Sequence, residues 1–321
     1  MQILVTGGAG FIGSHLCERL LTDGHVVTAI DDFSTGRASN LSNLDSSNRF
    51  TLVEGSILDV AILNPLVKEA DYVFHLAAAV GVFNIVNNPL ASLLTNIRGT
   101  ENVLEAAHAA KTPVFLTSSS EVYGKNISDS LKESDDRILG SPVTLRWSYS
   151  EAKAIDESLA YAYFVEKQLE TRIVRFFNTV GPRQLGAYGM VVPRFVKSAI
   201  ANEPITIYGD GTQTRCFAHI YDVIDAVIAI AFADNTIGKV INIGNDYEIS
   251  INDLAQKIIV ETGSKSGIVY VPYQEAYGDG FEDMERRVPN IDLINQLVGW
   301  KPKRDLTTMI SDISAGMKKN S

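Results

Sequence analysis

Short apolar runs alternate with longer amphipathic stretches through the first half of the chain. β-Branched and aromatic runs predict strands, whereas apolar residues spaced three and four positions apart predict helices. Strands are expected at 3–5, 26–30, 50–53, 72–76, 113–116 and 171–175, and helices at 14–22, 61–69, 96–110 and 149–167. Strands that alternate with helices at this spacing predict an α/β fold, with a parallel sheet covered by helices on both faces.

The pattern changes after about Gly181, where prolines become more frequent and the elements become shorter. We expect a first domain over residues 1–180 and a smaller second domain over residues 181–321. A helical pattern and a strand pattern at about 219–245 are expected to return to the first domain. The boundary is therefore predicted to be interleaved.

Composition and charge exclude several classes of protein. The 321 residues carry a formal net charge of −10, which argues against a nucleic-acid partner or an anionic membrane surface. No apolar run has the length that spans a membrane, and the first ten residues lack the features of a secretory signal. Cys17 and Cys216 lie far apart and the five histidines form no cluster, so we expect no metal and a cytoplasmic location.

Glycines at 7, 10 and 13 stand between the first expected strand and the first helix. Positions without a side chain let the backbone approach a pyrophosphate, and the helix start supplies N–H donors. Asp31 and Asp32 end the second strand, where a carboxylate accepts hydrogen bonds from ribose hydroxyls and repels a 2′-phosphate. NAD is therefore expected as the cofactor. The candidates for cofactor contact are Gly7, Gly10, Phe11, Ile12, Gly13, Asp31, Asp32, Ser56, Ile57, Leu76, Ala77, Ala78, Asn96, Tyr149 and Lys153.

Hydroxyl groups and one carboxylate, at 118–121, follow the apolar run that ends at Leu116. Further on, Tyr149 and Lys153 lie four residues apart and therefore on one face of a helix. A nearby cation stabilises a phenolate and lowers the pKa of a tyrosine, which makes Tyr149 a candidate base near neutral pH. A serine at the strand end would share the hydrogen bond of the substrate oxygen with this tyrosine.

Taken in order, the motifs GGAGFIG, Asp31, HLAA, SSSEVYG, YSEAK and RFFNTVGPR resemble those of the extended short-chain dehydrogenase/reductase superfamily. The chain is similar, over essentially its whole length, to the NAD-dependent nucleotide-sugar epimerases, dehydratases and decarboxylases of that superfamily. The resemblance implies a Rossmann domain that holds NAD and a smaller α/β domain that binds a UDP-linked sugar. It also implies oxidation at sugar C4, in which Tyr149 takes the hydroxyl proton and Ser119 is its hydroxyl partner.

The residues after Ser119 bear on which reaction follows the oxidation. Dehydratases of this group carry Asp-Glu there, whereas Ser120 and Glu121 match the Ser-Glu of UDP-glucuronate decarboxylases. Arg287, two residues before a proline, resembles a decarboxylase arginine, although Asn290 replaces the aspartate of that motif. Arg146 and Trp147 also resemble some of these relatives. We therefore favour a UDP-glucuronate decarboxylase that forms a UDP-xylose-type product, with Glu121 and Arg287 taking part in catalysis.

Two alternatives remain open at this stage. The chain resembles UDP-sugar 4-epimerases acting on UDP-glucose, UDP-glucuronate or UDP-N-acetylglucosamine, in which Arg287 would bind diphosphate. In that case Glu121 would be a structural carboxylate that accepts from backbone N–H groups. A silent NAD-binding sensor is disfavoured because Ser119, Tyr149 and Lys153 are all present.

The resemblance also implies contacts to the nucleotide sugar and to a second subunit. The expected substrate-binding residues are Ser120, Asn178, Val192, Arg194, Thr206, Tyr208, Arg215 and Arg287. Arginine suits a diphosphate because its planar fork meets two phosphate oxygens. The two long helices at 96–110 and 149–167 match those that pair subunits in this family, so a homodimer through a four-helix bundle is expected.

Overall fold

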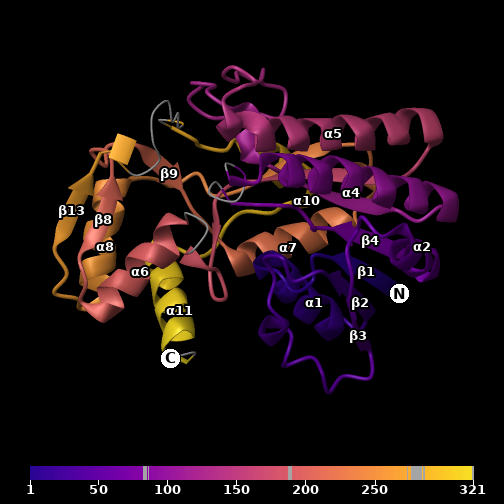
Figure 1. Cartoon of the computed structure of the whole chain (residues 1–321), viewed down its shortest axis with the longest axis horizontal. Helices are drawn as coiled ribbons and strands as arrows, with labels where there is room; N and C mark the ends of the chain where they lie inside the picture. Colours follow the sequence, from indigo (N-terminus) through magenta and orange to yellow (C-terminus); the bar gives the residue numbers. More distant parts are fainter. Residues whose placement is uncertain are drawn as a thin grey trace.

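A computed structural model describes residues 1–81, 85, 87–186, 190–272, 274–275, 284 and 286–319. A seven-stranded sheet in the order β11-β6-β5-β4-β1-β2-β3 forms the larger lobe (Figure 1). All of its strand pairings are parallel. The strands are β1 (Gln2–Thr6), β2 (Val26–Asp31), β3 (Phe50–Glu54), β4 (Tyr72–His75), β5 (Val114–Ser119), β6 (Thr171–Phe176) and β11 (Val240–Ile243).

Helices cover both faces of this sheet (Figure 1). One face packs against α2 (Val60–Glu69), α4 (Pro89–Ala110) and α5 (Ser148–Lys167), and the other against α1 (Phe11–Thr22), α7 (Ile220–Ala231) and α10 (Asp292–Val298). Ile3 and Val5 of β1 belong to the core on the α1 side, and Leu4 belongs to the core on the α4 side. Successive strand residues point to opposite faces, so a strand covered on both sides needs a continuous apolar run. The predicted α/β fold is confirmed.

Two helices begin earlier than the sequence pattern predicts. Helix α4 starts at Pro89, seven positions before the expected Asn96, because proline is well tolerated in the first turn of a helix. Helix α1 starts at Phe11, directly after Gly10, and includes Gly13. Glycine has low helix propensity, so the periodic pattern becomes visible only after it.

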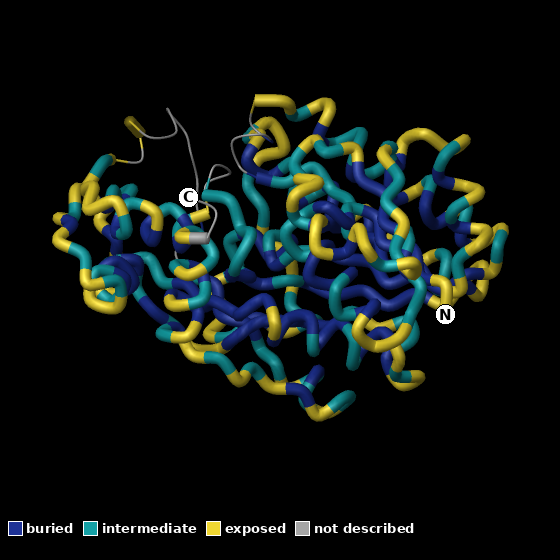
Figure 2. Tube along the Cα trace, turned by 90° about the horizontal axis from the view of Figure 1, so that it is seen from below, coloured by how far each residue is buried: buried dark blue, intermediate teal, exposed yellow. Residues whose placement is uncertain are grey.

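A smaller lobe lies beside the sheet, at the left of Figure 1, and has a core of its own. Its helices are α6 (Val191–Ala201), α8 (Ile251–Thr262) and α11 (Leu306–Lys319). Its strands form three pairs: β8 (Ile205–Tyr208) with β13 (Ile268–Val271), β9 (Thr214–Cys216) with β12 (Glu248–Ser250), and β7 (Thr179–Val180) with β10 (Ala218–His219). Buried residues run through the interior of both lobes (Figure 2). The domain boundary at residue 180 stays a prediction, while α7 and β11 lie in the larger lobe.

Short 3₁₀ helices connect several of these elements and carry part of the site. They are η1 (Ala38–Asn40), η2 (Ser120–Tyr123), η3 (Leu145–Trp147) and η5 (Asp234–Thr236). Among the described residues, no helix is long and apolar enough to cross a membrane, and no group of three or more metal-binding side chains comes together.

The order of the strands determines where a ligand site is expected. Strand β1 pairs with both β2 and β4, so the chain changes winding direction between β1 and β4. In doubly wound sheets, ligands bind beyond the carboxyl ends of the strands at this point. The glycine turn follows β1, and Ser119 ends β5, so both lie at this edge of the sheet.

Candidate active site

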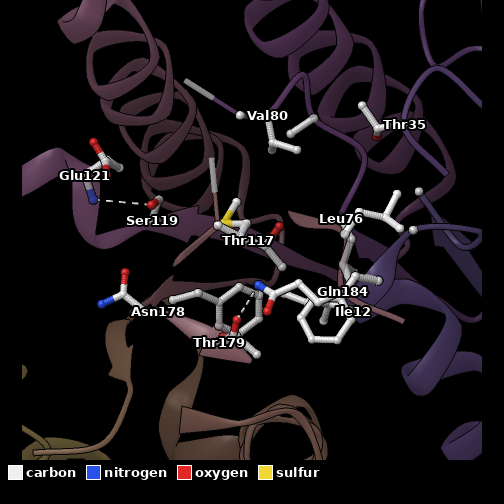
Figure 3. A pocket seen from close by; sticks show the side chains of 18 of the residues that line it. Ile12, Thr35, Leu76, Val80, Thr117, Ser119, Glu121, Asn178, Thr179 and Gln184 are labelled. Atoms are coloured by element: carbon white, nitrogen blue, oxygen red, sulfur yellow. Dashed lines mark hydrogen bonds between the residues drawn. The ribbon is translucent and has the colours of Figure 1, made fainter. Parts of the chain in front are cut away.

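A cavity of about 500 Å³ lies at this edge and extends to the smaller lobe (Figure 3). Ligand-binding cavities of enzymes commonly have volumes in this range. Most of the residues singled out from the sequence line it. They are Gly7, Gly10, Phe11, Ile12, Gly13, Asp31, Asp32, Ile57, Leu76, Ala77, Ala78, Ser119, Ser120, Glu121, Tyr149, Lys153, Asn178, Val192, Arg194, Tyr208, Arg215 and Arg287.

Three expected residues lie outside the lining of the cavity. Ser56 accepts a hydrogen bond from the backbone of Leu58, at 3.3 Å, and so supports a turn. Asn96 is buried, and its amide bonds both the N–H and the carbonyl of Ala79. Thr206 lies within the pair β8–β13. Asn96 thus fixes the backbone that follows β4. A direct ligand contact for Ser56, Asn96 and Thr206 stays a prediction.

Packing explains two of the three glycines in the turn after β1. Gly7 has a positive φ of 70°, and a Cβ there would lie 2.8 Å from the backbone nitrogen of Ala77. A Cβ on Gly13 would lie 2.1 Å from the carbonyl oxygen of Gly7. Gly10 meets only that same oxygen, at 3.1 Å, and opens to the cavity. Gly10 therefore presents its backbone to the cavity without a side chain, next to the N–H groups of the first turn of α1, as a pyrophosphate requires.

Asp31 lies at the end of β2 and is nearly buried. Its two carboxylate oxygens accept hydrogen bonds from the backbone N–H groups of Ala9, at 2.9 Å, and Phe33, at 2.8 Å. Burial raises the pKa of Asp31, and these backbone bonds oppose the rise. Asp32 is exposed and accepts from the backbone of Ser34 at 3.0 Å. The carboxylate of Asp31 is thus fixed at the cavity wall, where it suits a ribose hydroxyl and repels a phosphate.

Ser119 and Tyr149 lie together at the centre of the cavity lining. Ser119 accepts a hydrogen bond from the backbone N–H of Glu121 at 3.3 Å (Figure 3) and also bonds the phenol of Tyr149. Burial raises the pKa of Tyr149 above its ordinary value, and the carboxylates of Glu121 and Asp156 raise it further. The expectation that the pKa of Tyr149 is lowered is therefore wrong for the protein chain on its own.

Burial is the main physical reason, and the environment of Lys153 adds a second one. Its ammonium donates to the backbone carbonyl of Thr117 and to the carboxylate of Asp156, both at 3.1 Å. Lys153 is buried, and Asp156 offsets its charge from the same helix. The phenol of Tyr149 therefore gains less from the cation than the four-residue spacing alone predicts.

Glu121 lies between two arginines that come from different parts of the chain. Its Oε2 is 2.6 Å from Nη1 of Arg146, and its Oε1 is 2.7 Å from Nη1 of Arg287. Arg287 also donates to the hydroxyl of Ser120 at 3.3 Å. Burial raises the pKa of Glu121, but the two guanidinium groups outweigh it and hold the pKa well below its usual range. We call Arg146, Glu121 and Arg287 the arginine–glutamate cluster. Glu121 is thus bound by guanidinium groups, not by backbone N–H groups.

The wall of the cavity formed by the smaller lobe carries further arginines. The guanidinium of Arg194 lies 4.2 Å from the ring centroid of Tyr208, and Arg215 is buried in β9. Asn178 donates to the carbonyl of Cys216 at 2.9 Å, and Figure 3 shows its amide at the lower rim of the cavity. In the described lining, six cationic side chains face three carboxylates. A chain with a net charge of −10 therefore has a locally positive cavity, which suits anionic ligands.

Several lining residues were not expected from the sequence. Thr117 and Val80 line the cavity (Figure 3), and Gln184 donates to the carbonyl of Thr179 at 2.8 Å. Arg183 lines the cavity and bonds the hydroxyl of Ser14 in α1, at 3.1 Å. Other unexpected lining residues include Thr35, Thr179 and Met190, and Arg146, noted above only for its resemblance to relatives, also lines the cavity. Proximity to a motif was the available signal, because Thr117 precedes the serine row, Arg183 ends the RFFNTVGPR motif and Gln184 follows it.

Comparison with known proteins identifies the family. The sequence pattern of the GDP-mannose 4,6 dehydratase family matches residues 4–313. The chain belongs to this family. As a GDP-mannose 4,6 dehydratase family member, it is an enzyme of the extended short-chain dehydrogenase/reductase superfamily, and the resemblance found from the motifs is confirmed.

Curated family members are similar over nearly the whole chain. A UDP-N-acetyl-alpha-D-glucosaminuronate decarboxylase from Bacillus cytotoxicus is 41% identical over 302 residues, which cover 94% of this chain and 92% of the relative. A UDP-glucuronic acid decarboxylase 1 from Danio rerio is 35% identical and covers 94% of this chain and 69% of the relative.

Solved structures of the family share the fold. A UDP-glucuronic acid 4-epimerase from Bacillus cereus, in complex with UDP-glucuronic acid and NAD, superposes with a TM-score of 0.88 at 30% identity and full coverage of both chains. A dTDP-glucose 4,6-dehydratase from Bacillus anthracis, in complex with NAD, has a TM-score of 0.87 at 26% identity and covers 100% of this chain and 97% of its own. The NAD in these relatives agrees with the cofactor expected from the glycine turn and Asp31.

Proposed function

We propose that this protein is an NAD-dependent decarboxylase of a UDP-linked hexuronate, with UDP-glucuronate as the first candidate substrate. The observation that carries the proposal is the arginine–glutamate cluster, which lies beside Ser119 and Tyr149 in one cavity. The guanidinium groups of Arg146 and Arg287 both line this cavity. Guanidinium groups bind carboxylates well, so they suit the carboxylate that a uronate carries at C6.

The residues at the amino-terminal side of the cavity fit NAD. The cradle at Gly10 opens to the cavity, the first turn of α1 faces it, and Asp31 stands where the adenosine ribose would lie. When bound, NAD supplies the acceptor of the C4 hydride and returns that hydride at the end of the cycle. The protein chain supplies the binding, the orientation and the proton transfer.

Tyr149 is the proposed acceptor of the C4 hydroxyl proton. Ser119 bonds the same phenol and lies at the end of β5, so both oxygens can meet one substrate oxygen. Thr117 and Asp156 hold the ammonium group of Lys153 in place. There it can bind ribose hydroxyls and act as a cation near the phenol of Tyr149. After the carboxyl group has left, Tyr149 and Ser119 remain in position to donate to the C4 oxygen and stabilise the enolate.

The arginine–glutamate cluster favours loss of CO₂ over loss of water. In dehydration a carboxylate must remove the proton at C5, and a carboxylate whose pKa is strongly lowered is a weak base. In decarboxylation the C5–C6 bond breaks instead, the electron pair passes into the C4–C5 enolate, and C5 then takes a proton. A substrate carboxylate bound by Arg146 and Arg287 would be repelled by the carboxylate of Glu121, which binds the same arginines. Departure of the substrate carboxylate as neutral CO₂ removes that repulsion.

The uridine diphosphate is assigned to the smaller lobe. Arg194, Tyr208 and Arg215 line that part of the cavity, and Asn178 and Val192 adjoin it. Arginines bind phosphate oxygens in a bidentate manner, and a ring held under a guanidinium is rigid enough to stack on a base. The relative from Bacillus cytotoxicus acts, by its name, on an N-acetylated uronate, so UDP-N-acetylglucosaminuronate is the second substrate to test.

A second candidate reaction is 4-epimerisation of a UDP-sugar. The observation that favours it is the structural match to a UDP-glucuronic acid 4-epimerase with a TM-score of 0.88. Ser119, Tyr149 and Lys153 would serve this reaction equally, because it begins with the same oxidation. The reactions diverge after that oxidation: decarboxylation removes the C6 carboxyl group, whereas in 4-epimerisation the keto sugar keeps its C6 group and is reduced from its opposite face.

Product analysis separates these reactions. The purified protein, with NAD added, is incubated with UDP-glucuronate, UDP-N-acetylglucosaminuronate and UDP-glucose, and the products are followed by mass spectrometry and NMR. We expect CO₂ loss from at least one of the uronates and no reaction of UDP-glucose. A product of unchanged mass and galacto configuration would overturn decarboxylation and support 4-epimerisation.

We further propose that the enzyme is a homodimer paired through α4 and α5. On α5, the exposed residues Ile155, Ser158, Ala162 and Val165 are spaced three, four and three apart, so they form one stripe on the helix surface. Exposed small and apolar side chains on α5, which packs beside α4, suit a four-helix bundle. A cytoplasmic location is proposed because the two cysteines are free and buried.

A further inference from the structure

A network of buried polar groups is hydrogen-bonded to the proposed catalytic lysine. Asp156 lies one helical turn beyond Lys153 on α5, its side chain is 0% exposed, and its Oδ2 accepts from Nζ of Lys153 at 3.1 Å. The hydroxyl of Thr100, on α4, bonds the same carboxylate. Nε2 of His75 lies 3.1 Å from the Thr100 hydroxyl, and Nδ1 lies 2.8 Å from the hydroxyl of Thr6.

Three groups of this buried network are ionisable, namely His75, Lys153 and Asp156. Burial, together with the charge of Lys153, lowers the pKa of His75 to about 3, so the imidazole is neutral. The neighbouring Glu157 is bound through both oxygens to Arg175, at 2.9 and 2.7 Å, and its charge is compensated there. The remaining ion pair is that of Lys153 with Asp156. Burial raises the pKa of Asp156, and the ammonium of Lys153 opposes the rise.

Helix geometry places this pair in line with the phenol. Residues 149, 153 and 156 are spaced four and three apart, so they lie on one face of α5. We propose that Asp156 is a positioning residue that sets how readily Tyr149 gives up its proton, by holding Lys153 in place and offsetting its charge. This inference rests on the proposed oxidation at C4 with Tyr149 as the base.

The other charged groups around Tyr149 belong to the arginine–glutamate cluster. Glu121 faces the phenol from η2, while Arg146 of η3 and Arg287 bind the carboxylate of Glu121. Ser119 of β5 faces the phenol as a neutral hydroxyl. These groups stay unchanged when Asp156 is altered, so a variant at Asp156 isolates the lysine side of the site.

Asp156→Asn removes the negative charge and keeps the shape of the side chain. Lys153 retains two oxygen acceptors, the Thr117 carbonyl and the new amide oxygen. The phenolate of Tyr149 then loses a repulsive neighbour and gains an uncompensated cation, because the carboxylate of Asp156 raises the pKa of Tyr149. The variant should titrate Tyr149 at lower pH, by on the order of one unit for a buried charge at this range.

The test compares pH profiles of kcat/KM for the wild type and Asp156→Asn on the substrate that the wild type turns over. We expect the acidic limb of the profile to move to lower pH by about one unit in the variant. Glu157→Gln is the matched control, since it removes a buried carboxylate at the next position but leaves Lys153 untouched. It should lower stability without moving the limb. An unmoved limb in Asp156→Asn, or a limb moved to higher pH, would overturn the proposal.

A second measurement needs no substrate. Phenolate absorbance is titrated in the NAD-loaded protein, and the Tyr149 contribution is isolated by subtracting the matching variant that also carries Tyr149→Phe. A lower midpoint in Asp156→Asn supports the proposal, and an equal or higher midpoint overturns it. If the midpoint is lowered but the protein converts no UDP-sugar, the proposed function is wrong and the inference on Asp156 is supported.

Discussion

The acidity of Glu121 depends on the two arginines that bind it. Because its folded pKa is lowered, the ionised carboxylate adds stability above its unfolded pKa of about 4.3, and this contribution is lost as the pH falls toward the folded value. The group is therefore fully ionised over the whole neutral range. Its part in the proposed reaction is to supply a fixed negative charge, while proton transfer belongs to Tyr149.

Glu121→Gln should reveal this linkage in stability measurements. Removing one partner from a buried ion cluster leaves guanidinium charge uncompensated, and we expect the free energy of unfolding to fall by about 3–5 kcal/mol at neutral pH. Urea unfolding of both proteins should show that the difference between their free energies of unfolding becomes smaller below about pH 4, where the wild-type carboxyl takes up its proton. A difference in the free energy of unfolding that does not change with pH would contradict a stabilising role for the charge of Glu121.

Tyr149→Phe tests the proton acceptor itself. The change removes one oxygen from a half-buried residue and leaves the glycine turn and Asp31 intact. Loss of a general base typically slows a reaction by about 10²–10⁴-fold, so turnover of the UDP-sugar should fall by at least that much. NAD content, measured after denaturation of the purified protein, should stay at the wild-type level. Turnover near that of the wild type would rule out the proposed mechanism.

At the scale of elements, apolar runs located the sheet strands well because both faces of the sheet are covered. Strands β2, β3 and β6 begin where the pattern places them and end one residue later, and β1 extends one residue further at each end. Helix starts were located less well, because Gly13 and Pro89 interrupt the periodicity at the first turns of α1 and α4. First turns are held by local backbone geometry and by tertiary contacts, which periodicity does not record.

The glycine turn offers a prediction at this scale. In Gly13→Ala the new Cβ would lie 2.1 Å from the Gly7 carbonyl oxygen, so the turn must move away from α1. We expect a loss of about 1–3 kcal/mol in the free energy of unfolding, together with a marked loss of bound NAD. Gly267→Ala is the control, because a Cβ there meets nothing within 4 Å. Equal NAD content in the two variants would contradict the role of the turn.

At the scale of the whole molecule, the cavity exists only because two lobes contribute to it. Ser119 and Tyr149 come from the larger lobe, whereas Arg194 and Arg215 come from the smaller one. The positive charge of the cavity contrasts with the net charge of −10 of the chain. Negative charge elsewhere on the surface keeps other polyanions away, while the cavity attracts a small dianionic nucleotide.

The proposed dimer can be tested at the same scale. Val165→Glu places a charge on the exposed stripe of α5, and burying that charge in a four-helix bundle is unfavourable. We expect light scattering to give a dimer mass for the wild type and a monomer mass for the variant. Val260→Glu makes the same change at an exposed position of α8, in the smaller lobe, and should leave the dimer intact. A monomeric wild type would contradict the proposal.

By itself, the sequence determined the fold class and which segments meet at the cavity. Parallel strands bring their carboxyl ends to one edge, so residues that follow β1, β4, β5 and β6 had to lie together once the alternation was recognised. The glycine turn, Ser119, Tyr149 and Lys153 therefore line one cavity, as expected. This part of the site follows from backbone periodicity, which is a local property of the chain.

Only the tertiary structure decided the charges that those residues experience. Arg146 and Arg287 are 25 and 166 positions from Glu121, and no local pattern shows that both bind it. The spacing of Tyr149 and Lys153 suggested an acidified phenol, yet burial and Asp156 raise its pKa. A pKa depends on desolvation and on distances between side chains from separate elements, and both arise only when the chain is packed.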